Sequence, residues 1–215
     1  MTKRIYKAAL FDLDGVLIDT EGLYTQFWNE IGKQFDKPST FANDIKGTTL
    51  NNILDRYFQP EYHRDIENAI NEYQAAMPFV LFDGVMEFLS QLKQQNVPMA
   101  IVTSSDDAKM KSLALQLPQL LDLMNCIVDA SMVTLSKPDP QGYLMAASML
   151  EVDPKECIVF EDSLQGLEAG RRAGAKVVGL ITTNPAHAVL PLCDQAIESW
   201  IGITPQQYGF HYDGK

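Results

Sequence analysis

Short apolar runs that alternate with helical patterns constrain the fold of this chain more than any other feature. Five such runs are expected to form strands, at residues 8–13, 97–103, 126–128, 157–160 and 176–181. Helical periodicity follows the later runs or precedes them, at residues 85–95, 106–115, 140–150 and 163–173. Strands that are apolar on both faces and alternate with helices are typical of a parallel sheet covered on both sides. The predicted fold class is therefore α/β, with a Rossmann-like, doubly wound parallel sheet.

The long segment between the first two apolar runs breaks this alternation. It contains helical patterns and no convincing strand, with the helices expected at residues 20–33, 50–58 and 61–77. We therefore predict a small all-helical cap domain at residues 19–81, inserted into a catalytic core made of residues 1–18 and 82–215. Residues 200–215 receive no assignment from the sequence.

The charge of the chain limits its partners. The formal net charge is -11, and such a surface repels both nucleic-acid backbone and anionic membrane, so neither is expected as a partner. The amino terminus turns apolar too briefly for a secretion signal, and no apolar run has the length of a membrane span. We expect a cytoplasmic protein that is a monomer or a weak homodimer.

Polar side chains lie at or beyond the carboxyl ends of the predicted strands, at the edge of the sheet where ligands of open parallel sheets bind. They are Asp12, Asp14, Thr103, Ser104, Lys137, Glu161 and Asp162. Carboxylates this close together repel each other unless a cation neutralises them, and oxygen ligands suit Mg²⁺. A lysine and hydroxyl groups beside Mg²⁺ suit a phosphoryl group. Because Asp12 and Asp14 are two residues apart on extended backbone, they project to the same face, as a nucleophile and a proton donor would.

Four segments carry a resemblance to the haloacid dehalogenase superfamily, in its branch with a helical cap after the first strand. They are residues 11–21 (FDLDGVLIDTE), 103–105 (TSS), 136–138 (SKP) and 160–163 (FEDS), and they follow the order of the family's motifs. The resemblance implies that Asp12 forms an aspartyl phosphate and that Asp14 is the general acid and base. It also implies a Mg²⁺ site made by Asp12, the backbone carbonyl of Asp14 and Asp162, with Glu161 either a direct ligand or a residue that supports the ligands. Thr103, the Ser104 amide and Lys137 would then bind the phosphoryl group.

Asp14 separates two chemistries within this superfamily. A halide leaves without a proton, whereas an alkoxide needs one, so Asp14 favours phosphoester chemistry over dehalogenation. We therefore predict a phosphatase that acts on a small phosphorylated metabolite. A second class of protein stays open, namely a phospho-accepting or ligand-binding module without turnover, because an acid pair with Thr and Lys is also found in receiver domains.

The predicted cap carries the candidate residues for substrate specificity. The segment 44–49 is similar to the cap loop that addresses the substrate in β-phosphoglucomutase, and it makes Lys46 and Gly47 candidates. Tyr24 is a third candidate, at a position where the mutase has a histidine, and Leu50 stands near the place of its phosphate-binding arginine. These two differences favour hydrolysis, and phosphosugar mutase activity remains the alternative.

Overall fold

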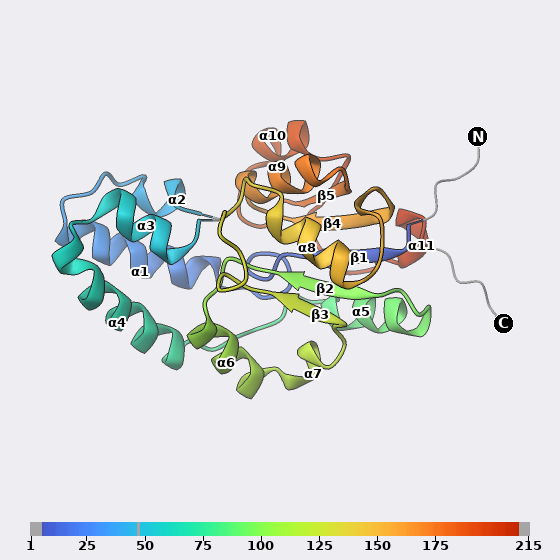
Figure 1. Ribbon diagram of the computed structural model, residues 1–215, viewed down its shortest axis with the longest axis horizontal. Coiled ribbons are helices and arrows are strands. Elements are labelled where there is room, and N and C mark those ends of the chain that lie inside the picture. The colour runs from blue at the N-terminus through green and yellow to red at the C-terminus, as the bar shows by residue number, and fades with distance from the viewer. Residues whose placement is uncertain (1–5, 47, 211–215) are drawn as a thin grey trace.

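The sheet is fully parallel, as the alternation of strands and helices predicts. The structure is a computed structural model that describes residues 6–46 and 48–210. Within these residues six strands form one sheet in the order β3-β2-β1-β4-β5-β6, and all neighbours are parallel (Figure 1). The strands are β1 (Ala8–Phe11), β2 (Met99–Val102), β3 (Cys126–Val128), β4 (Cys157–Glu161), β5 (Lys176–Leu180) and β6 (Gln195–Ile197).

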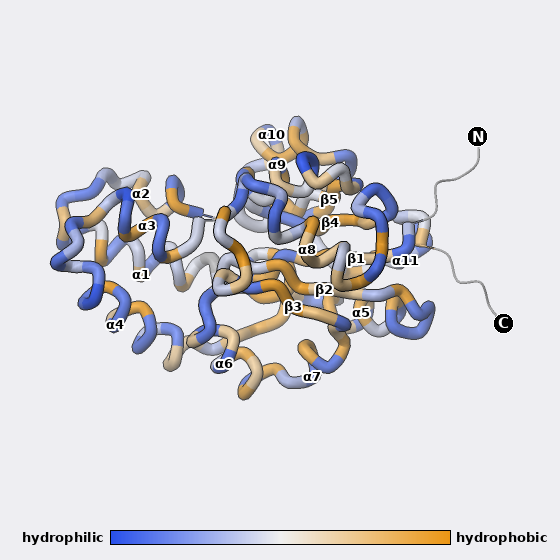
Figure 2. Tube along the Cα trace, in the orientation of Figure 1, coloured by the Kyte–Doolittle hydropathy of each residue, from blue (hydrophilic) through white to orange (hydrophobic). Residues whose placement is uncertain are grey.

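Helices cover both faces of this sheet, which confirms the doubly wound α/β prediction. Along β1 the side chains alternate, so that Ala9 and Phe11 enter one hydrophobic cluster while Ala8 and Leu10 enter another. The first cluster includes residues of α5 (Val85–Gln94), α6 (Asp107–Gln116) and α7 (Pro118–Leu121), and the second includes residues of α8 (Gln141–Met149) and α9 (Leu164–Ala173). Figure 2 shows the strands as the apolar centre between these layers. Short elements complete this part: η1 (Pro154–Glu156), α10 (Ala186–Val189), η2 (Leu190–Leu192) and α11 (Pro205–Tyr208).

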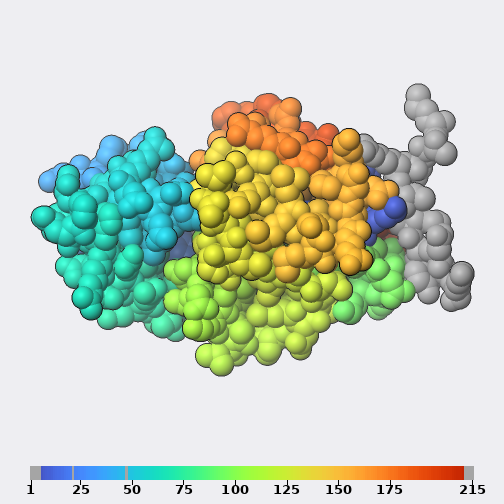
Figure 3. All heavy atoms as spheres, in the orientation of Figure 1, coloured from blue at the N-terminus to red at the C-terminus, as the bar shows by residue number. Residues whose placement is uncertain are grey.

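Four helices follow β1 before the chain returns to the sheet. They are α1 (Glu21–Gln34), α2 (Phe41–Asp44), α3 (Leu50–Tyr57) and α4 (Pro60–Ala76), and they lie together at one end of the molecule (Figures 1 and 3). Their buried side chains form a hydrophobic cluster of their own, which includes Phe27, Trp28, Phe41, Leu54 and Ile70. We refer to residues 19–81 as the helical segment.

The two connections of the helical segment run side by side. Ile18 forms an isolated bridge with Leu81, and the Asp19 N–H donates to the Val80 carbonyl oxygen over 2.8 Å. The Phe82 N–H likewise donates to the carbonyl oxygen of Leu17. The chain therefore leaves the sheet and returns to it at one place, which lies next to the carboxyl end of β1.

Several elements near the carboxyl end of the chain were not predicted from the sequence. Strand β6 and the stretch from Trp200 to Phe210 received no assignment, yet Trp200 is buried and packs its ring against Phe11, Phe88 and Phe160. Its indole N–H donates to the carbonyl oxygen of Val16 over 2.8 Å. This tail covers one face of the sheet, a role that depends on contacts far away in the chain. In the described part of the chain, none of the helices has the length and hydrophobicity needed to cross a bilayer.

Candidate active site

The site begins where β1 ends. The Asp12 N–H donates to the Phe160 carbonyl oxygen over 3.0 Å, which holds the residue beside β4 after the ladder has ended. Asp12 is 8% exposed. Gly15 then turns the chain with φ of +72°, and a side chain there would collide with the carboxylate of Asp162. Glycine at this position thus lets the ends of two different strands approach each other.

Lys137 connects two buried carboxylates. Its ammonium group donates to Asp12 Oδ1 and to Glu161 Oε1, each over 2.5 Å, and to the Val102 carbonyl oxygen over 3.2 Å. Burial alone would lower the pKa of Lys137, but the charges of Asp12 and Glu161 raise it above its usual value. Lys137 is therefore a fixed positive charge at the edge of the sheet.

Glu161 is fully enclosed by donors from the protein. Besides Lys137, the Tyr143 hydroxyl donates to its Oε1 over 2.9 Å. Its other oxygen accepts the N–H groups of Asp162 and Ser163 at 2.9 and 3.0 Å, and the Ser163 hydroxyl at 3.1 Å. A side chain at Gly166, in the first turn of α9, would overlap this carboxylate. Glycine at this position therefore leaves the space that the Glu161 carboxylate occupies. Glu161 thereby orients Lys137 and the turn that carries Asp162.

Three buried carboxylates come together as a possible metal site. Ligand atoms of Asp12, Glu161 and Asp162 lie within 4.8 Å of one another. The pKa of Asp12 is raised to about 8, chiefly by burial; the charge of Lys137 opposes the rise, and the charges of Glu161 and Asp14 favour it. The Asp12 carboxyl group therefore lies where further positive charge is needed to keep it ionised near neutral pH.

Asp14 lies at the more open side of the site, where its side chain is 20% exposed. Its Oδ1 accepts from the Thr20 hydroxyl and from the Lys109 ammonium group. Its Oδ2 accepts from the Ser105 hydroxyl over 3.1 Å. Three donors from different segments thus fix both carboxylate oxygens of Asp14.

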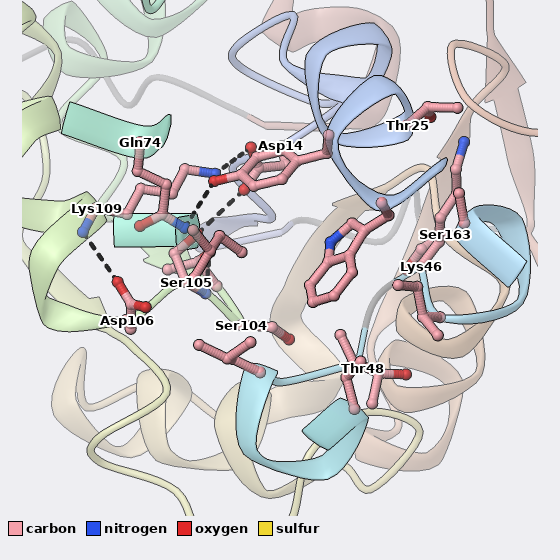
Figure 4. A pocket seen from close by; sticks show the side chains of 18 of the residues that line it. Asp14, Thr25, Lys46, Thr48, Gln74, Ser104, Ser105, Asp106, Lys109 and Ser163 are labelled. Atoms are coloured by element: carbon pink, nitrogen blue, oxygen red, sulfur yellow. Dashed lines mark hydrogen bonds and ion pairs between the residues drawn. The ribbon is translucent and has the colours of Figure 1, made fainter. Parts of the chain in front are cut away.

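The hydroxyl cluster after β2 is ordered by its own hydrogen bonds. Thr103 is 5% exposed, its hydroxyl donates to Ser105 Oγ over 2.9 Å, and the Ser105 N–H donates back to Thr103 Oγ1 over 3.0 Å. Ser104 lines the same pocket as Asp14 (Figure 4). The sequence-predicted phosphate-binding residues Thr103 and Ser104 therefore border the same space as the two aspartates.

A pocket of about 130 Å³ joins this site to the helical segment. On the sheet side it is lined by Asp12, Asp14, Thr103, Ser104, Ser105, Asp106, Lys109, Asp162 and Ser163. On the helical side it is lined mainly by apolar or aromatic residues with a few polar ones: Tyr24, Thr25, Trp28, Ala42, Ile45, Lys46, Thr48, Leu50, Ile53, Ile70 and Gln74. In Figure 4, Lys46 and Thr48 lie on the opposite side of the pocket from Asp14 and Lys109.

Most of the site residues predicted from the sequence come together in the structure, on two sides of one pocket. Asp12, Asp14, Glu161, Asp162, Lys137, Thr103 and Ser104 come together at the edge of the sheet, and Tyr24 and Lys46 line the pocket from the helical side. Lys137 contacts Asp12 directly through an ion pair. Gly47 lies outside the described residues.

Sequence reasoning missed Lys109, which is 1% exposed and paired with Asp14. One signal was present, because a lysine in the first turn of a helix meets the positive end of the helix dipole and is unfavourable there. Tyr143 was missed as well, since nothing in the pattern of α8 shows that its hydroxyl reaches Glu161.

Known proteins resemble this chain over most of its length. A sequence profile of the haloacid dehalogenase-like hydrolases matches residues 9–180. The chain is 35% identical to the validoxylamine A 7'-phosphate phosphatase of Streptomyces hygroscopicus subsp. limoneus, over 86% of this chain and 90% of that protein. It is 31% identical to the β-phosphoglucomutase of Bacillus subtilis (strain 168), over 81% and 83%.

A solved structure of a family IA hydrolase from Entamoeba histolytica HM-1:IMSS shares the fold. It superposes with a TM-score of 0.78 and 26% identity, covering 94% of this chain and 97% of the other. The match of the family profile spans β1 to β5, and thus both strand ends that carry the buried acids. The chain belongs to the haloacid dehalogenase-like hydrolases.

Proposed function

We propose that this protein is a Mg²⁺-dependent phosphatase that hydrolyses a small phosphomonoester, such as a sugar phosphate, through an aspartyl phosphate on Asp12. The observation that carries the proposal is the arrangement of Asp12, which lies against Lys137 while Asp14 and the Thr103 cluster border the same pocket. The Streptomyces relative, by its name a phosphatase of validoxylamine A 7'-phosphate, supports hydrolysis of a phosphomonoester.

Charge supports a divalent cation at the edge of the sheet. Four carboxylates and two lysines meet there, which leaves two negative charges unbalanced, from the set Asp12, Asp14, Glu161, Asp162, Lys109 and Lys137. All candidate ligands are oxygens, which suit Mg²⁺. Asp12, Asp162 and the Asp14 carbonyl would hold the ion, with Glu161 supporting them through its bonds to the turn. When bound, Mg²⁺ would supply charge neutralisation for the phosphoryl oxygens and the acids.

The chain's own residues then divide the reaction into two displacements. In the first, an Asp12 carboxylate oxygen attacks phosphorus, the bond from phosphorus to the leaving oxygen breaks, and Asp14 gives its proton to that oxygen. In the second, water attacks the aspartyl phosphate, Asp14 takes the proton of the water, and Asp12 is released with inorganic phosphate. Lys137, the Thr103 hydroxyl and the Ser104 amide balance charge on the phosphoryl oxygens in both.

The lining of the pocket favours hydrolysis over mutase chemistry. A phosphosugar mutase must hold two phosphates at once, and the second needs positive charge at the helical side. Among the described lining residues the basic ones are Lys46 and Lys109, and Lys109 is already paired with Asp14. Leu50 lies in the wall where an arginine would serve a second phosphate. The Bacillus relative, named as a mutase, makes that activity the alternative to test.

The helical segment would act as the cap of this enzyme. We place the boundaries at residues 19–81 for the cap and at 1–18 and 82–215 for the catalytic core. The separate hydrophobic cluster of α1–α4 and the paired connections beside Ile18 support this division. Tyr24, Lys46 and Gly47 would then contribute to selecting the leaving group.

The test is steady phosphate release from p-nitrophenyl phosphate with Mg²⁺, followed by a screen of sugar and nucleotide monophosphates. Many turnovers per enzyme support the proposal. Release of at most one equivalent identifies a phospho-accepting module instead, and no release overturns the proposal. Incubation of β-glucose 1-phosphate with a bisphosphate primer is expected to give free phosphate, and accumulation of glucose 6-phosphate would show a mutase.

A further inference from the structure

Lys109 is a buried cation that the proposed reaction does not use. Its side chain is 1% exposed, although lysine is rarely enclosed to this degree unless it is paired. Its ammonium group donates to Asp14 Oδ1. Burial alone would lower the pKa of Lys109, but the charge of Asp14 raises it above its usual value.

The surroundings of Lys109 link two parts of the molecule. Lys109 belongs to α6 beside the sheet, whereas its ammonium group lies 4.4 Å from the ring centre of Tyr24, on α1 of the helical segment. The Tyr24 hydroxyl in turn accepts from the Gln74 side chain, on α4, over 3.1 Å. Phe79 adds a second ring at 5.9 Å. One lysine therefore touches the acid and rests on rings of the helical segment.

The position of Lys109 in its helix is unfavourable by itself. It lies in the first turn of α6, whose amino end carries positive partial charge, and its N–H donates to the capping side chain of Asp106 over 2.9 Å. A cation there is disfavoured by the helix dipole and by burial together. The contact with Asp14 offsets both effects, which indicates a role at Asp14 beyond the stability of α6.

We propose that Lys109 is a positioning residue that holds the Asp14 carboxylate in place for acid and base catalysis. Through its contact with the ring of Tyr24, it also links the position of this carboxylate to the helical segment. The inference rests on the proposed function, because it assumes that Asp14 moves protons in the reaction. Thr20 and Ser105 hold Asp14 as well, each through a short hydroxyl side chain. Lys109 is the donor whose charged group also lies against the Tyr24 ring, so it couples the acid to the pocket wall.

The test is a double-mutant cycle with p-nitrophenyl phosphate and Mg²⁺, in which Lys109→Met is made in the natural chain and in Asp14→Asn. Methionine keeps the length and apolar stem of the side chain and removes its charge. We expect kcat to fall about 10- to 100-fold in the natural chain without a rise in KM, because Asp14 loses part of its contribution as the base that activates water against the aspartyl phosphate. In the Asp14→Asn background the further loss should be below about twofold, because Lys109 acts through Asp14.

Two outcomes overturn the inference. Equal losses in both backgrounds would show that Lys109 acts independently of Asp14, and a rise in KM alone would make it a substrate ligand. Lys111→Met is the matched control, because this lysine lies on the same helix, pairs with Asp107 at the surface and should leave kcat unchanged. Should Lys109→Met not fold, Tyr24→Leu removes the ring beside the ammonium group and enters the same cycle. Absence of turnover in the natural chain would instead contradict the proposed function.

Discussion

The two aspartates at the end of β1 are held by different regions of the molecule. Asp12 contacts Lys137, which the chain brings from the loop after β3, and lies beside Glu161 at the end of β4. Asp14 contacts Lys109, which lies against Tyr24 of the helical segment. Each aspartate thus has its own lysine, and the lysine of Asp14 also lies against a ring of the helices that line the far side of the pocket.

This difference suggests that different regions of the molecule control the two aspartates. Asp12, the proposed nucleophile, is held mainly from the edge of the sheet, so its environment should vary little between substrates. Asp14, the proposed acid and base, is linked through Lys109 to Tyr24 in the wall of the pocket. Changes on the Asp12 side should therefore remove all reaction, while changes on the Asp14 side should depend on the substrate.

The largest effect is expected from Asp12→Asn. The change keeps the shape of the side chain and removes the nucleophile, so kcat should fall at least about 10³-fold with any phosphomonoester. Steady-state phosphate release measures this, and circular dichroism checks the fold. Asp107→Asn, on the surface of α6, is the control and should turn over normally. Retained turnover in Asp12→Asn would assign the nucleophile elsewhere.

Removal of the metal is expected to abolish turnover and to make the stability of the protein depend on pH through the raised pKa of Asp12. Since that pKa rises from 3.8 to about 8, the folded protein without metal holds a proton that the unfolded chain has lost. The contribution of this proton to the stability of the metal-free protein is complete below about pH 4 and is lost as the pH rises through about 8. Mg²⁺ replaces this proton, so it should raise the Tm of EDTA-treated protein more at pH 8.5 than at pH 6.

Thermal unfolding with and without Mg²⁺ at the two pH values provides the measurement. The Asp12→Asn variant is the control, because its amide does not titrate and the difference between the two pH values should shrink. An equal rise in Tm at both values would contradict a metal site that includes the Asp12 carboxylate.

A smaller, substrate-dependent effect is expected from Asp14→Asn. With glycerol 3-phosphate, whose alkoxide needs a proton, kcat should fall about 10²- to 10⁴-fold. The first turnover of p-nitrophenyl phosphate should be slowed much less, because p-nitrophenolate leaves without help. Rapid mixing that follows the nitrophenolate burst measures that step. Equal losses in the first turnover of both substrates would remove Asp14 from the role of acid.

The smallest effect is expected at the helical side of the pocket. Lys46→Met should raise KM for a sugar phosphate about tenfold and leave kcat nearly unchanged, because a charged hydrogen bond to the leaving group is lost. Lys33→Met, an exposed lysine at the end of α1, is the matched control. A fall in kcat without a change in KM would move Lys46 from substrate selection to the chemistry.

Most of the site at the edge of the sheet could be predicted from the sequence, because its residues belong to short local motifs at strand ends. An apolar strand followed by Asp12-Leu13-Asp14-Gly15 fixes both side chains on one face and the turn after them. Strand β6 could not be found in this way, because it is short and only half-buried, and its place depends on pairing with β5. Trp200 was missed for a similar reason, since its partners lie far away in the chain.

The sequence by itself determined the alternation of strands and helices, the acids at the strand ends and the family of the chain, because each depends on neighbouring residues. The tertiary structure decided which charge meets which. It brought Lys137 to Asp12 and Lys109 to Asp14, across 125 and 95 positions of the chain. Such pairings follow from packing of the whole sheet and the helices on it, which residue spacing does not encode. Asp14 thus has a partner that its motif gives no means to predict.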